Sequence, residues 1–302
     1  MFARLKSKIG LCYLKLYARV FPKRYADSLY RKSFGKHINW KHPEDLNQWI
    51  NVLQYSSDIS LWPTLADKYR VRKYVENKGL GDTLVKLYGK WDRPEDIEFD
   101  SLPKSFVLKS NNGSGQVMIV EDKSELNLET VRKVCKEWLK VKFGLLTGEP
   151  HYLKIKPCII AEELLDVTKQ TGESTSLIDY KIWCFGGEPH VIYAVTDRNK
   201  GFFTQHCYDT EWRDRSDLLH YDDHHLKPKD GGLHRPHNLN KMLEYARILS
   251  AGYPQMRVDL YEVDGKVYFG ELTMSSNCGR MEYFTPEALQ EFGKFVAANT
   301  KR

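Results

Sequence analysis

Several features that would assign a protein to a class at once are missing from this 302-residue sequence. It has no apolar run long enough to span a membrane. It also shows no cleavable signal, because Lys15 and Arg19 interrupt the N-terminal apolar segment and no A-x-A site follows. The six cysteines form no CxxC pair, which is typical of thiols in a reducing compartment. With 41% hydrophobic residues, we expect a folded cytoplasmic protein of two or three lobes.

Acidic residues are nearly absent from the first 42 positions, which hold eleven Lys and Arg and one acid, Asp27. The segment therefore has a formal charge of +10, and the other 260 residues sum to −4. Apolar residues recur there at helical spacing: Phe2, Leu5, Ile9, Cys12, Leu16 and Val20. Such a helix can lie on an anionic membrane surface, or it can pack on its own domain with its charges in water; both alternatives stay open. Nucleic-acid binding is disfavoured, because no recognised motif accompanies the charge.

Neither of two familiar phosphate loops is present in "FVLKSNNGSGQVMIV", residues 106–120. The Walker A pattern fails because Gln116 follows Gly115, and the dinucleotide fingerprint fails because a strand, not a helix, follows the glycines. The segment predicts a hairpin whose glycine tip can bring backbone N–H groups to a phosphate, with Lys109 just before the tip. An ordinary surface hairpin with a lysine at its edge gives the same pattern.

Elsewhere, helices and strands alternate in blocks, which favours an α+β fold of antiparallel sheets with helices packed on them. We expect helices within 43–80, in "NLETVRKVCKEWLKVKFG" and in "LNKMLEYARILSAG", a buried strand in "KPCIIAEELL", and a hairpin around Gly186 and Gly187. Residues 209–240 are polar and loop-like. The first of the two quoted helices should bury one face, formed by Leu128, Val131, Val134, Cys135 and Trp138.

The last hairpin, "MRVDLYEVDGKVYFGELT", carries two acids, Asp259 and Glu271, on neighbouring strands. A two-residue turn at 264–265 would put them on opposite faces, whereas a three-residue loop with a bulge at Gly265 would pair Arg257 with Glu271 and make the acids diagonal neighbours. We predict the bulged form. Two such carboxylates can hold Mg²⁺ ions that bridge nucleotide phosphates, although a solvated strand face of mixed charge is the simpler alternative.

Five histidines crowd one polar segment, but their spacing matches no standard zinc pattern, so we expect a solvated loop there. They are His220, His224, His225, His234 and His237.

Five motifs in a fixed order resemble the ATP-grasp superfamily, and most closely its TupA-like branch, which is associated with cell-surface polysaccharide synthesis. They are "LADKYRVRKYVENKG", "LPKSFVLKSNNGSG", "KPCIIAEELL", "DYKIWCFGGEPHVI" and "RVDLYEVDGKVYFGEL". The match covers roughly residues 40–300. It implies an ATP-grasp fold in which two α+β lobes clasp ATP. We divide the chain into a helical region at 1–104, a small lid subdomain at 105–165 and a C-terminal subdomain with the metal site at 166–302.

The resemblance also implies roles for individual residues. ATP contacts fall to two lysines, the glycine loop and an adenine-reading hinge: Lys68, Lys109, Asn111, Gly113, Ser114, Gly115, Glu162, Glu163 and Leu165. Mg²⁺ ligation falls to Asp259 and Glu271, with Asn277 as a further ligand. Lys181 would meet the terminal phosphate, and Arg257 and Arg280 would stabilise charge on the transferred phosphoryl group. The chain departs from the superfamily at Thr273, where an Asn is common.

These roles imply an ATP- and Mg²⁺-dependent ligase that joins a carboxylate and an amine through an acyl phosphate. The substrates would be derived from sugars or amino acids, in the making of a capsule, O-antigen or teichuronopeptide-like polymer. A glycosyltransferase that uses a nucleotide-sugar and a non-catalytic ATP-binding scaffold are the alternatives. The expected location is the cytoplasm, with peripheral contact to the inner face of the membrane through the basic helix.

Overall fold

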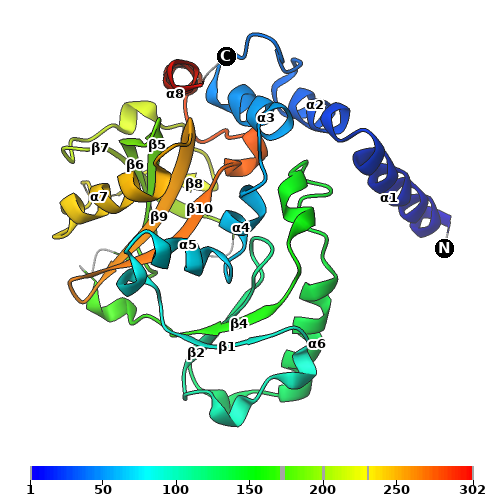
Figure 1. Ribbon diagram of the computed structural model, residues 1–302, viewed down its shortest axis with the longest axis vertical. Helices are drawn as coiled ribbons and strands as arrows, with labels where there is room; N and C mark the ends of the chain where they lie inside the picture. Colours follow the sequence, from blue (N-terminus) through cyan, green and yellow to red (C-terminus); the bar gives the residue numbers. More distant parts are fainter. Residues whose placement is uncertain (1, 171–173, 199–200, 230, 301–302) are drawn as a thin grey trace.

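The computed structural model describes residues 2–170, 174–198, 201–229 and 231–300, with the backbone alone for residues 2–9. Two lobes lie one above the other, and a helical arm projects from one side (Figure 1). The α-helices are α1 Phe2–Val20, α2 Pro22–Phe34, α3 Leu46–Ser56, α4 Trp62–Ala66, α5 Val71–Asn77, α6 Leu128–Lys140, α7 Leu239–Ser250 and α8 Pro286–Asn299. The strands are β1 Leu87–Trp91, β2 Phe106–Ser110, β3 Val117–Val120, β4 Ile159–Glu162, β5 Asp179–Phe185, β6 Glu188–Thr196, β7 Phe203–Asp209, β8 His225–Leu226, β9 Gln255–Val263 and β10 Lys266–Thr273.

The small lobe is a four-stranded antiparallel sheet in the order β1-β4-β2-β3, with α6 packed against it. Asn127 starts α6 by accepting a hydrogen bond from the backbone N–H of Thr130 at 2.9 Å, which satisfies one of the unpaired donors of the first turn. The lobe has a hydrophobic core of its own, which includes Phe106, Leu108, Val131, Cys135 and Ile159. A separate core lets this lobe form a unit beside the rest of the chain.

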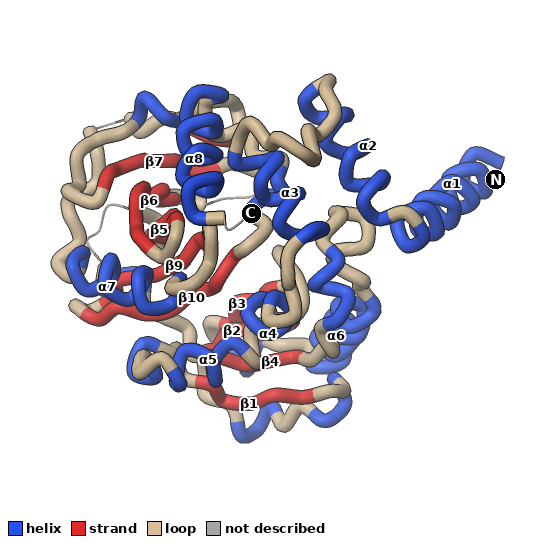
Figure 2. Tube along the Cα trace, turned by 45° about the horizontal axis from the view of Figure 1, so that its top comes forward, coloured by secondary structure: helices blue, strands red, loops and turns tan. Residues whose placement is uncertain are grey.

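The large lobe is a six-stranded sheet in the order β10-β9-β5-β6-β7-β8, antiparallel except for the short parallel pair β7 and β8. The helix α7 packs on β5, β6 and β9, and α8 packs on β5 and on α3 (Figure 2). Thr285 caps α8 by accepting from the N–H of Ala288, and Pro286 occupies the first turn, where its missing N–H has no bond to lose. The central strand β5 is buried on both faces, with Trp183 and Phe185 fully enclosed.

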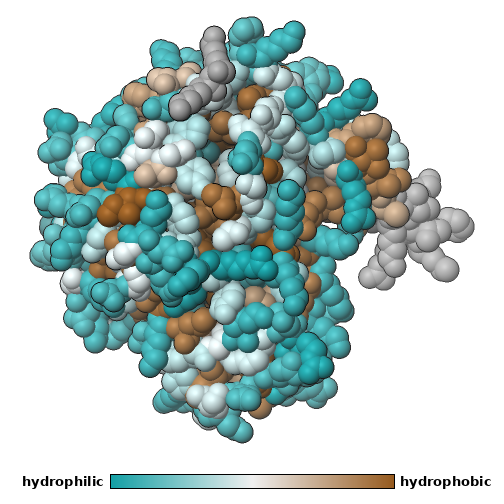
Figure 3. Space-filling model, viewed as in Figure 1, coloured by the Kyte–Doolittle hydropathy of each residue, from teal (hydrophilic) through white to brown (hydrophobic). Residues whose placement is uncertain are grey.

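The arm consists of α1 and α2. The helix α1 extends away from both lobes, and hydrophobic residues gather over it (Figures 1 and 3). From residue 10 to residue 20, only Tyr17 and Ala18 are shielded from solvent, so α1 is not packed on its own domain along this stretch. Of the apolar face expected from the sequence, Cys12, Leu16 and Val20 are exposed, and the side chains at 2, 5 and 9 lie outside those described. None of the described helices is long and apolar enough to cross a bilayer.

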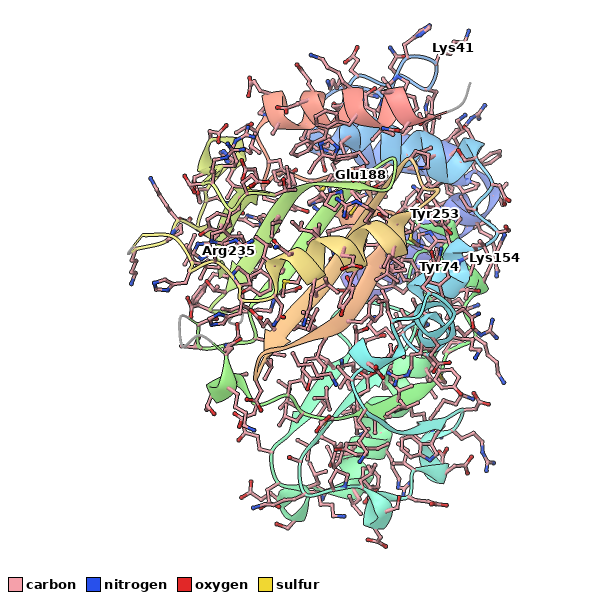
Figure 4. All side chains as sticks on the ribbon, turned by 60° about the vertical axis from the view of Figure 1, so that its left-hand side comes forward. Lys41, Tyr74, Lys154, Glu188, Arg235 and Tyr253 are labelled. Atoms are coloured by element: carbon pink, nitrogen blue, oxygen red, sulfur yellow. The ribbon has the colours of Figure 1, made fainter. Side chains whose placement is uncertain are left out.

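The segment that joins the lobes holds the short helices α4 and α5. Both contribute to the large-lobe core through Trp62, Leu65 and Val75. The Tyr74 hydroxyl donates to the carbonyl of Leu249 at 2.9 Å, which ties α5 to the end of α7, close to Tyr253 (Figure 4). Lys68 lies between α4 and α5, which are both attached to the large lobe, and its backbone N–H donates to Asn111 of the small lobe.

The α+β architecture is confirmed, as are the hairpin at 106–120, the strand in "KPCIIAEELL" and the three helical regions. Two details add to the predictions. Leu128 is 40% exposed, because it is the first residue of α6 and lies beyond the edge of the small-lobe core. The polar segment 209–240 is mostly irregular up to α7, but it contains a turn of 3₁₀ helix and the short strand β8, which pairs with the edge of β7. The division at residues 104 and 165 stays a prediction; β1, from the first of those segments, is the edge strand of the small sheet.

Candidate functional site

A row of charged side chains crosses three strands of the large sheet. Lys181 on β5 pairs in register with Asp259 on β9, and Asp259 pairs with Glu271 on β10, so all three share one face. Because side chains alternate along a strand, the same face also carries the residues two positions away, among them Asp179 and Arg257. The sheet thus collects two cations and three carboxylates on one patch, which we call the charged row.

Hydrogen bonds join the charged row into a network. Arg257 grips Asp259 with two donors, each at 2.7 Å, and reaches Glu271 at 2.9 Å. Lys181 lies between Asp259, at 2.5 Å, and Asp179, at 2.7 Å. Two parallel bonds from a guanidinium to one carboxylate fix both side chains, so the network is rigid before any ligand arrives.

Burial and charge act against each other within the charged row. Burial alone would raise the pKa of Asp259, but Arg257 and Lys181 outweigh it and hold that pKa below its usual value. For Asp179 the balance is reversed: burial, with Asp259 nearby, raises its pKa despite the Lys181 ammonium. Asp259 is therefore the carboxylate best kept ionised at neutral pH.

The register of this hairpin corrects the sequence prediction. The turn has two residues, Asp264 and Gly265, both with positive φ, and the bulge lies at Gly270 instead. Glu271 consequently lies directly opposite Asp259, and Arg257 lies opposite Thr273. The shared face of the two acids was expected, but the reason given for it was wrong. An Asp-Gly turn of this kind matches the twist of the strands and needs no third residue.

On the small lobe, Lys109 of β2 bonds Glu162 of β4 at 2.8 Å. Arg72 binds the other carboxylate oxygen of Glu162 at 3.2 Å and also donates to the carbonyl of Val85. The Lys109 side chain keeps 31% of its surface exposed. Because this ammonium is already partly in solvent, it can exchange its carboxylate partner for a phosphate at little desolvation cost.

Lys68 bridges the two lobes. Its backbone N–H donates to the carbonyl of Asn111 at 3.1 Å, and its ammonium donates to the carbonyl of Gly113 in the glycine loop. Burial lowers the pKa of Lys68, Lys109 lowers it further, and Glu271 offsets part of the effect. The charges of Lys109, on the small lobe, and Glu271, in the charged row, both affect the pKa of Lys68. Lys68 is therefore close to both groups.

The glycine loop is anchored at its base and open at its tip. The Asn111 side chain bonds the carbonyl of Lys156 at 3.1 Å and the N–H of Cys158 at 2.7 Å. Gly113 is buried, and a Cβ there would lie 3.1 Å from the Phe143 ring. Ser114 and Gly115 are exposed, and Gly115 has a φ of +77°. Only the tip is therefore placed to contact a ligand without breaking the anchor, and its closure over ATP stays a prediction.

The expected hinge follows β4. Glu162 is its last residue, the N–H of Glu163 donates to the carbonyl of Lys86 at 2.9 Å, and Leu165 packs with Val85 and Val263. This small apolar cluster is separate from the two main cores, and an aromatic base would find apolar contact there. Its role in adenine binding stays a prediction.

The loop after β10 places the remaining predicted residues. The Asn277 amide donates to the carbonyl of Arg280 at 2.7 Å, and the Arg280 guanidinium donates to the carbonyl of Thr147 at 3.1 Å. Asn277 and Cys278 have positive φ, at 43° and 57°, a conformation that costs energy outside glycine. Asn277 thus supports the loop, whereas Thr273 is the residue bonded to Glu271, at 3.1 Å.

The donors in the charged row fit a magnesium ion shared with phosphate. Among the described residues, no three His, Cys, Asp or Glu side chains form a metal-binding group, which includes the described histidines of the polar segment. Mg²⁺, however, is commonly held by one or two carboxylates together with substrate phosphates and water. The Glu271 side chain is 43% exposed, and all its hydrogen bonds within the described part of the chain go to one oxygen. The second oxygen is available to a hard cation.

Comparison with known proteins decides the family. A model of the family described as TupA-like ATPgrasp matches residues 48–296. The chain belongs to the TupA-like ATP-grasp family. The matched region contains both lobes of the ATP-grasp fold, while α1 and α2 precede it.

No curated protein matches this TupA-like chain. Among solved structures, D-alanine–D-alanine ligase from Bacillus anthracis complexed with ATP has 16% identity and a TM-score of 0.46, covering 78% of this chain and 66% of its own. ATP-grasp ligase PsnB complexed with a minimal precursor has 12% identity and a TM-score of 0.43, covering 83% and 69%. Phosphoribosylamine–glycine ligase from Thermotoga maritima has 14% identity and a TM-score of 0.42, covering 71% and 48%. The chain thus spans about two thirds of the first of these ligases.

Three residues of this TupA-like site were missed in the sequence. Asp179 could have been found, because it lies two positions before Lys181 and so on the same strand face. Arg72 had no local signal, since its partner Glu162 is ninety residues away. Glu149 is buried, and it accepts from Ser275 at 2.6 Å and from the Cys278 thiol at 3.0 Å. Glu149 supports the loop after β10, and no local pattern in its own segment predicts that contact.

Proposed function

We propose that this protein is an ATP-dependent ligase that joins a carboxylate to an amine through an acyl phosphate. The observation that carries the proposal is the charged row of the large sheet facing Lys68, Lys109 and the glycine loop. Such an arrangement gathers cations and carboxylates where a triphosphate and its metal would be held between two lobes. Family membership supports the same reading.

The two lysines and the loop tip would hold the phosphates. Lys109 would exchange Glu162 for a phosphate oxygen, and Lys68 would leave the carbonyl of Gly113 for another. Backbone N–H groups at Ser114 and Gly115 would add neutral donors. Glu162, Glu163 and Leu165 would receive the adenine at the hinge.

Asp259 and Glu271 would hold Mg²⁺, with Thr273 beside them and Asn277 as the predicted further ligand. The bound ion supplies charge neutralisation for the phosphates. Lys181 would lie at the terminal phosphate, because it stands next to Asp259 in the row. Arg257 would keep Asp259 and Glu271 in place and face the transferred group.

The reaction proceeds in two balanced steps. A carboxylate oxygen of the first substrate attacks the terminal phosphorus of ATP, which forms the acyl phosphate and releases ADP. The amine then attacks the acyl carbon, the carbon–oxygen bond to phosphate breaks, and the amine proton leaves to solvent, giving an amide and inorganic phosphate. Lys181, Arg257 and Arg280 would offset negative charge during phosphoryl transfer. The two lobes would exclude water from the acyl phosphate.

We further propose that the substrates derive from sugars or amino acids and that the product belongs to a cell-surface polysaccharide such as a capsule, an O-antigen or a teichuronopeptide-like polymer. The chain would act in the cytoplasm, with peripheral contact to the membrane through the basic N-terminal helix. The support for the polymer is the resemblance of five motifs, and the support for the contact is the exposed face of α1.

The test is the melting temperature of the purified protein with Mg²⁺ and ATP, GTP or a UDP-sugar. A ligand at 100 times its dissociation constant adds about 2.7 kcal/mol of stability. We expect ATP alone to stabilise the protein, with the effect reduced by about half or more in Lys109→Ala and Glu271→Ala and kept in Lys104→Ala, an exposed lysine of the same lobe.

Stabilisation by a UDP-sugar and not by ATP would overturn the ligase and favour a glycosyltransferase. If ATP binds, phosphate release is then measured with mixtures of amino acids and uronic acids. Binding without turnover on any carboxylate–amine pair would favour the ATP-binding scaffold, a reading for which Thr273 leaves room.

A further inference from the structure

A cavity of about 560 Å³ lies in the arm, between α1, α2 and the segment that follows α2. Its walls are mostly basic: Arg24, Arg31, Lys32 and His37, with Tyr17 and Ser28 beside them. It shares no residue with the charged row, and its lining residues precede the region that the family match covers. The ligase reaction as proposed makes no use of it.

Among the described residues, a single acid, Asp27, lines this basic cavity. Asp27, its one acid, is already occupied, because one oxygen lies 2.6 Å from the His37 ring and the other accepts from the N–H of Ile38 at 2.9 Å. Within the described part of the chain, Arg24, Arg31 and Lys32 form no ion pair. Guanidinium and ammonium groups gathered without a carboxylate are suited to a phosphate group.

Exposed apolar side chains lie on α1 and at the start of α2, the two helices that line the cavity. Six large ones are exposed over eleven residues of the arm: Leu11, Tyr13, Leu14, Leu16, Val20 and Phe21. Leu16 is 60% exposed and Val20 is 55% exposed, although each would be more stable out of water. Figure 3 shows this hydrophobic patch on the helix that stands clear of both lobes. An apolar face of this size beside clustered basic groups is the pattern of a helix that lies in a membrane interface.

We propose that the arm is a docking site for a membrane that contains anionic phospholipid. The phosphate of a lipid headgroup occupies the cavity between Arg24, Arg31 and Lys32, while Leu16, Val20 and their neighbours enter the acyl boundary. Charge complementarity favours this occupant, because the first 42 residues carry a net charge of +10 and the cytoplasmic leaflet is negative. The inference rests on the proposed membrane contact and not on the ligase reaction.

The arm also connects the membrane to the candidate site. Tyr25 of α2 donates to the carbonyl of Leu146 at 3.1 Å, and Arg280 donates to the next carbonyl, that of Thr147, at 3.1 Å. Ala26 and Leu29 of the same helix pack near Gly148. The helix that bears the cavity therefore contacts the loop beside Arg280, so docking would hold that side of the site near the bilayer.

The test is sedimentation of the full chain with vesicles of phosphatidylglycerol and phosphatidylcholine, and with vesicles of phosphatidylcholine alone. We expect binding to the anionic vesicles only, weakened at least tenfold in Arg31→Glu/Lys32→Glu and in Leu16→Asp/Val20→Asp. The matched control is Lys133→Glu/Lys294→Glu, an equal charge change at exposed lysines outside the arm, which should bind like the parent. The rise in melting temperature with ATP, measured on the same samples, reports the ligase site separately.

Three outcomes would overturn the proposal. Equal binding to phosphatidylcholine vesicles, whose headgroup phosphate is offset by choline, would show that the arm does not select anionic lipid. Equal weakening in the control would show that overall charge, not the arm, attracts the protein. A dimer that Leu16→Asp/Val20→Asp dissociates, without vesicle binding by the parent, would assign the apolar face to a second copy of the chain.

Discussion

Lys181 of the large lobe and Lys109 of the small lobe face the same candidate site from opposite sides, in different surroundings. The Lys181 side chain is 12% exposed and lies between two carboxylates, one of which Arg257 also grips. The Lys109 side chain is 31% exposed and has one carboxylate partner, Glu162. We therefore expect the fold to depend on the network around Lys181, and a ligand to be able to replace Glu162 as the partner of Lys109.

Asp259→Asn is the substitution that should damage the large lobe most. It removes the carboxylate that holds Arg257 and Lys181, and so leaves two buried cations short of a partner. We expect a loss of about 3–5 kcal/mol in the free energy of unfolding, measured by urea denaturation. The control is Asp264→Asn in the turn of the same hairpin, where the side chain is 71% exposed and the change should stay within about 0.5 kcal/mol. Equal effects in the two variants would show that the network is not structural.

Lys109→Met should have the opposite profile. Because the side chain is partly exposed and its partner keeps Arg72, we expect the free energy of unfolding to change by less than about 1 kcal/mol. Loss of a charged hydrogen bond to phosphate should weaken ATP binding by about 1.5–3 kcal/mol, or roughly ten- to a hundredfold, as measured by calorimetry. Lys104→Met, at an exposed site of the same lobe, should leave ATP affinity unchanged. If Lys109→Met lowered the free energy of unfolding by several kcal/mol but left ATP affinity unchanged, Lys109 would be the structural lysine and the contrast with Lys181 would be wrong.

His151 shows what burial does where no charged partner compensates it. The ring lies against Trp62 and Tyr152, neither nitrogen is hydrogen-bonded to a described residue, and burial lowers its pKa to about 3. In the unfolded chain this histidine has an ordinary pKa near 6.5 and binds a proton that it does not bind in the folded chain. The free energy of unfolding therefore falls as the pH drops from about 6.5 towards 3. At pH 5 this loss is about 2 kcal/mol.

His151→Phe should remove this loss and flatten the dependence of the unfolding free energy on pH between 7 and 5. His42→Phe, at an exposed histidine, should leave the dependence of the parent unchanged. An unaltered pH profile in the His151 variant would mean that water or a partner reaches the ring.

The site residues fall into those that local patterns predict and those that only the tertiary structure supplies. Lys109, Lys181 and Asp259 were predicted because each lies in a short motif, and strand periodicity then determines the face it occupies. Arg72 and Glu149 bind partners far away along the chain, and no local pattern encodes such contacts. Their positions depend on how the lobes pack, which periodicity does not specify.

In the last hairpin, a glycine does mark the bulge, but it is Gly270 and not Gly265 as predicted. A glycine inside a strand indicates a bulge or a close approach of backbone, and Gly270 is such a residue: a Cβ there would lie 2.9 Å from the carbonyl oxygen of Asp259. Gly265 already satisfied the two-residue turn with Asp264. Placing the bulge at Gly270 would have given the observed pairing of Asp259 with Glu271.

Substitution of Thr273 should change the free energy of unfolding least, and it tests whether the rigid network of the large lobe extends to the exposed end of the charged row. Its hydroxyl donates to Glu271 at 3.1 Å and accepts from Arg257 at 3.1 Å, so it extends the rigid network to the exposed end of the charged row. Thr273→Val keeps the shape and removes the hydroxyl. Because Arg257 retains Asp259 and Glu271, we expect a loss of only about 1 kcal/mol in the free energy of unfolding.

Thr273→Asn separates the structural role of this position from a metal-binding one. An amide offers a carbonyl oxygen that a magnesium ion accepts as a ligand. If Glu271 and residue 273 hold the ion together, the Asn variant should need less Mg²⁺ for half-maximal stabilisation by ATP, and the Val variant should need more. If neither variant shifts the Mg²⁺ requirement while Thr273→Val still lowers stability, residue 273 serves the network alone. In that case the ion would depend on Asp259 and Glu271 without help from the next residue on their face.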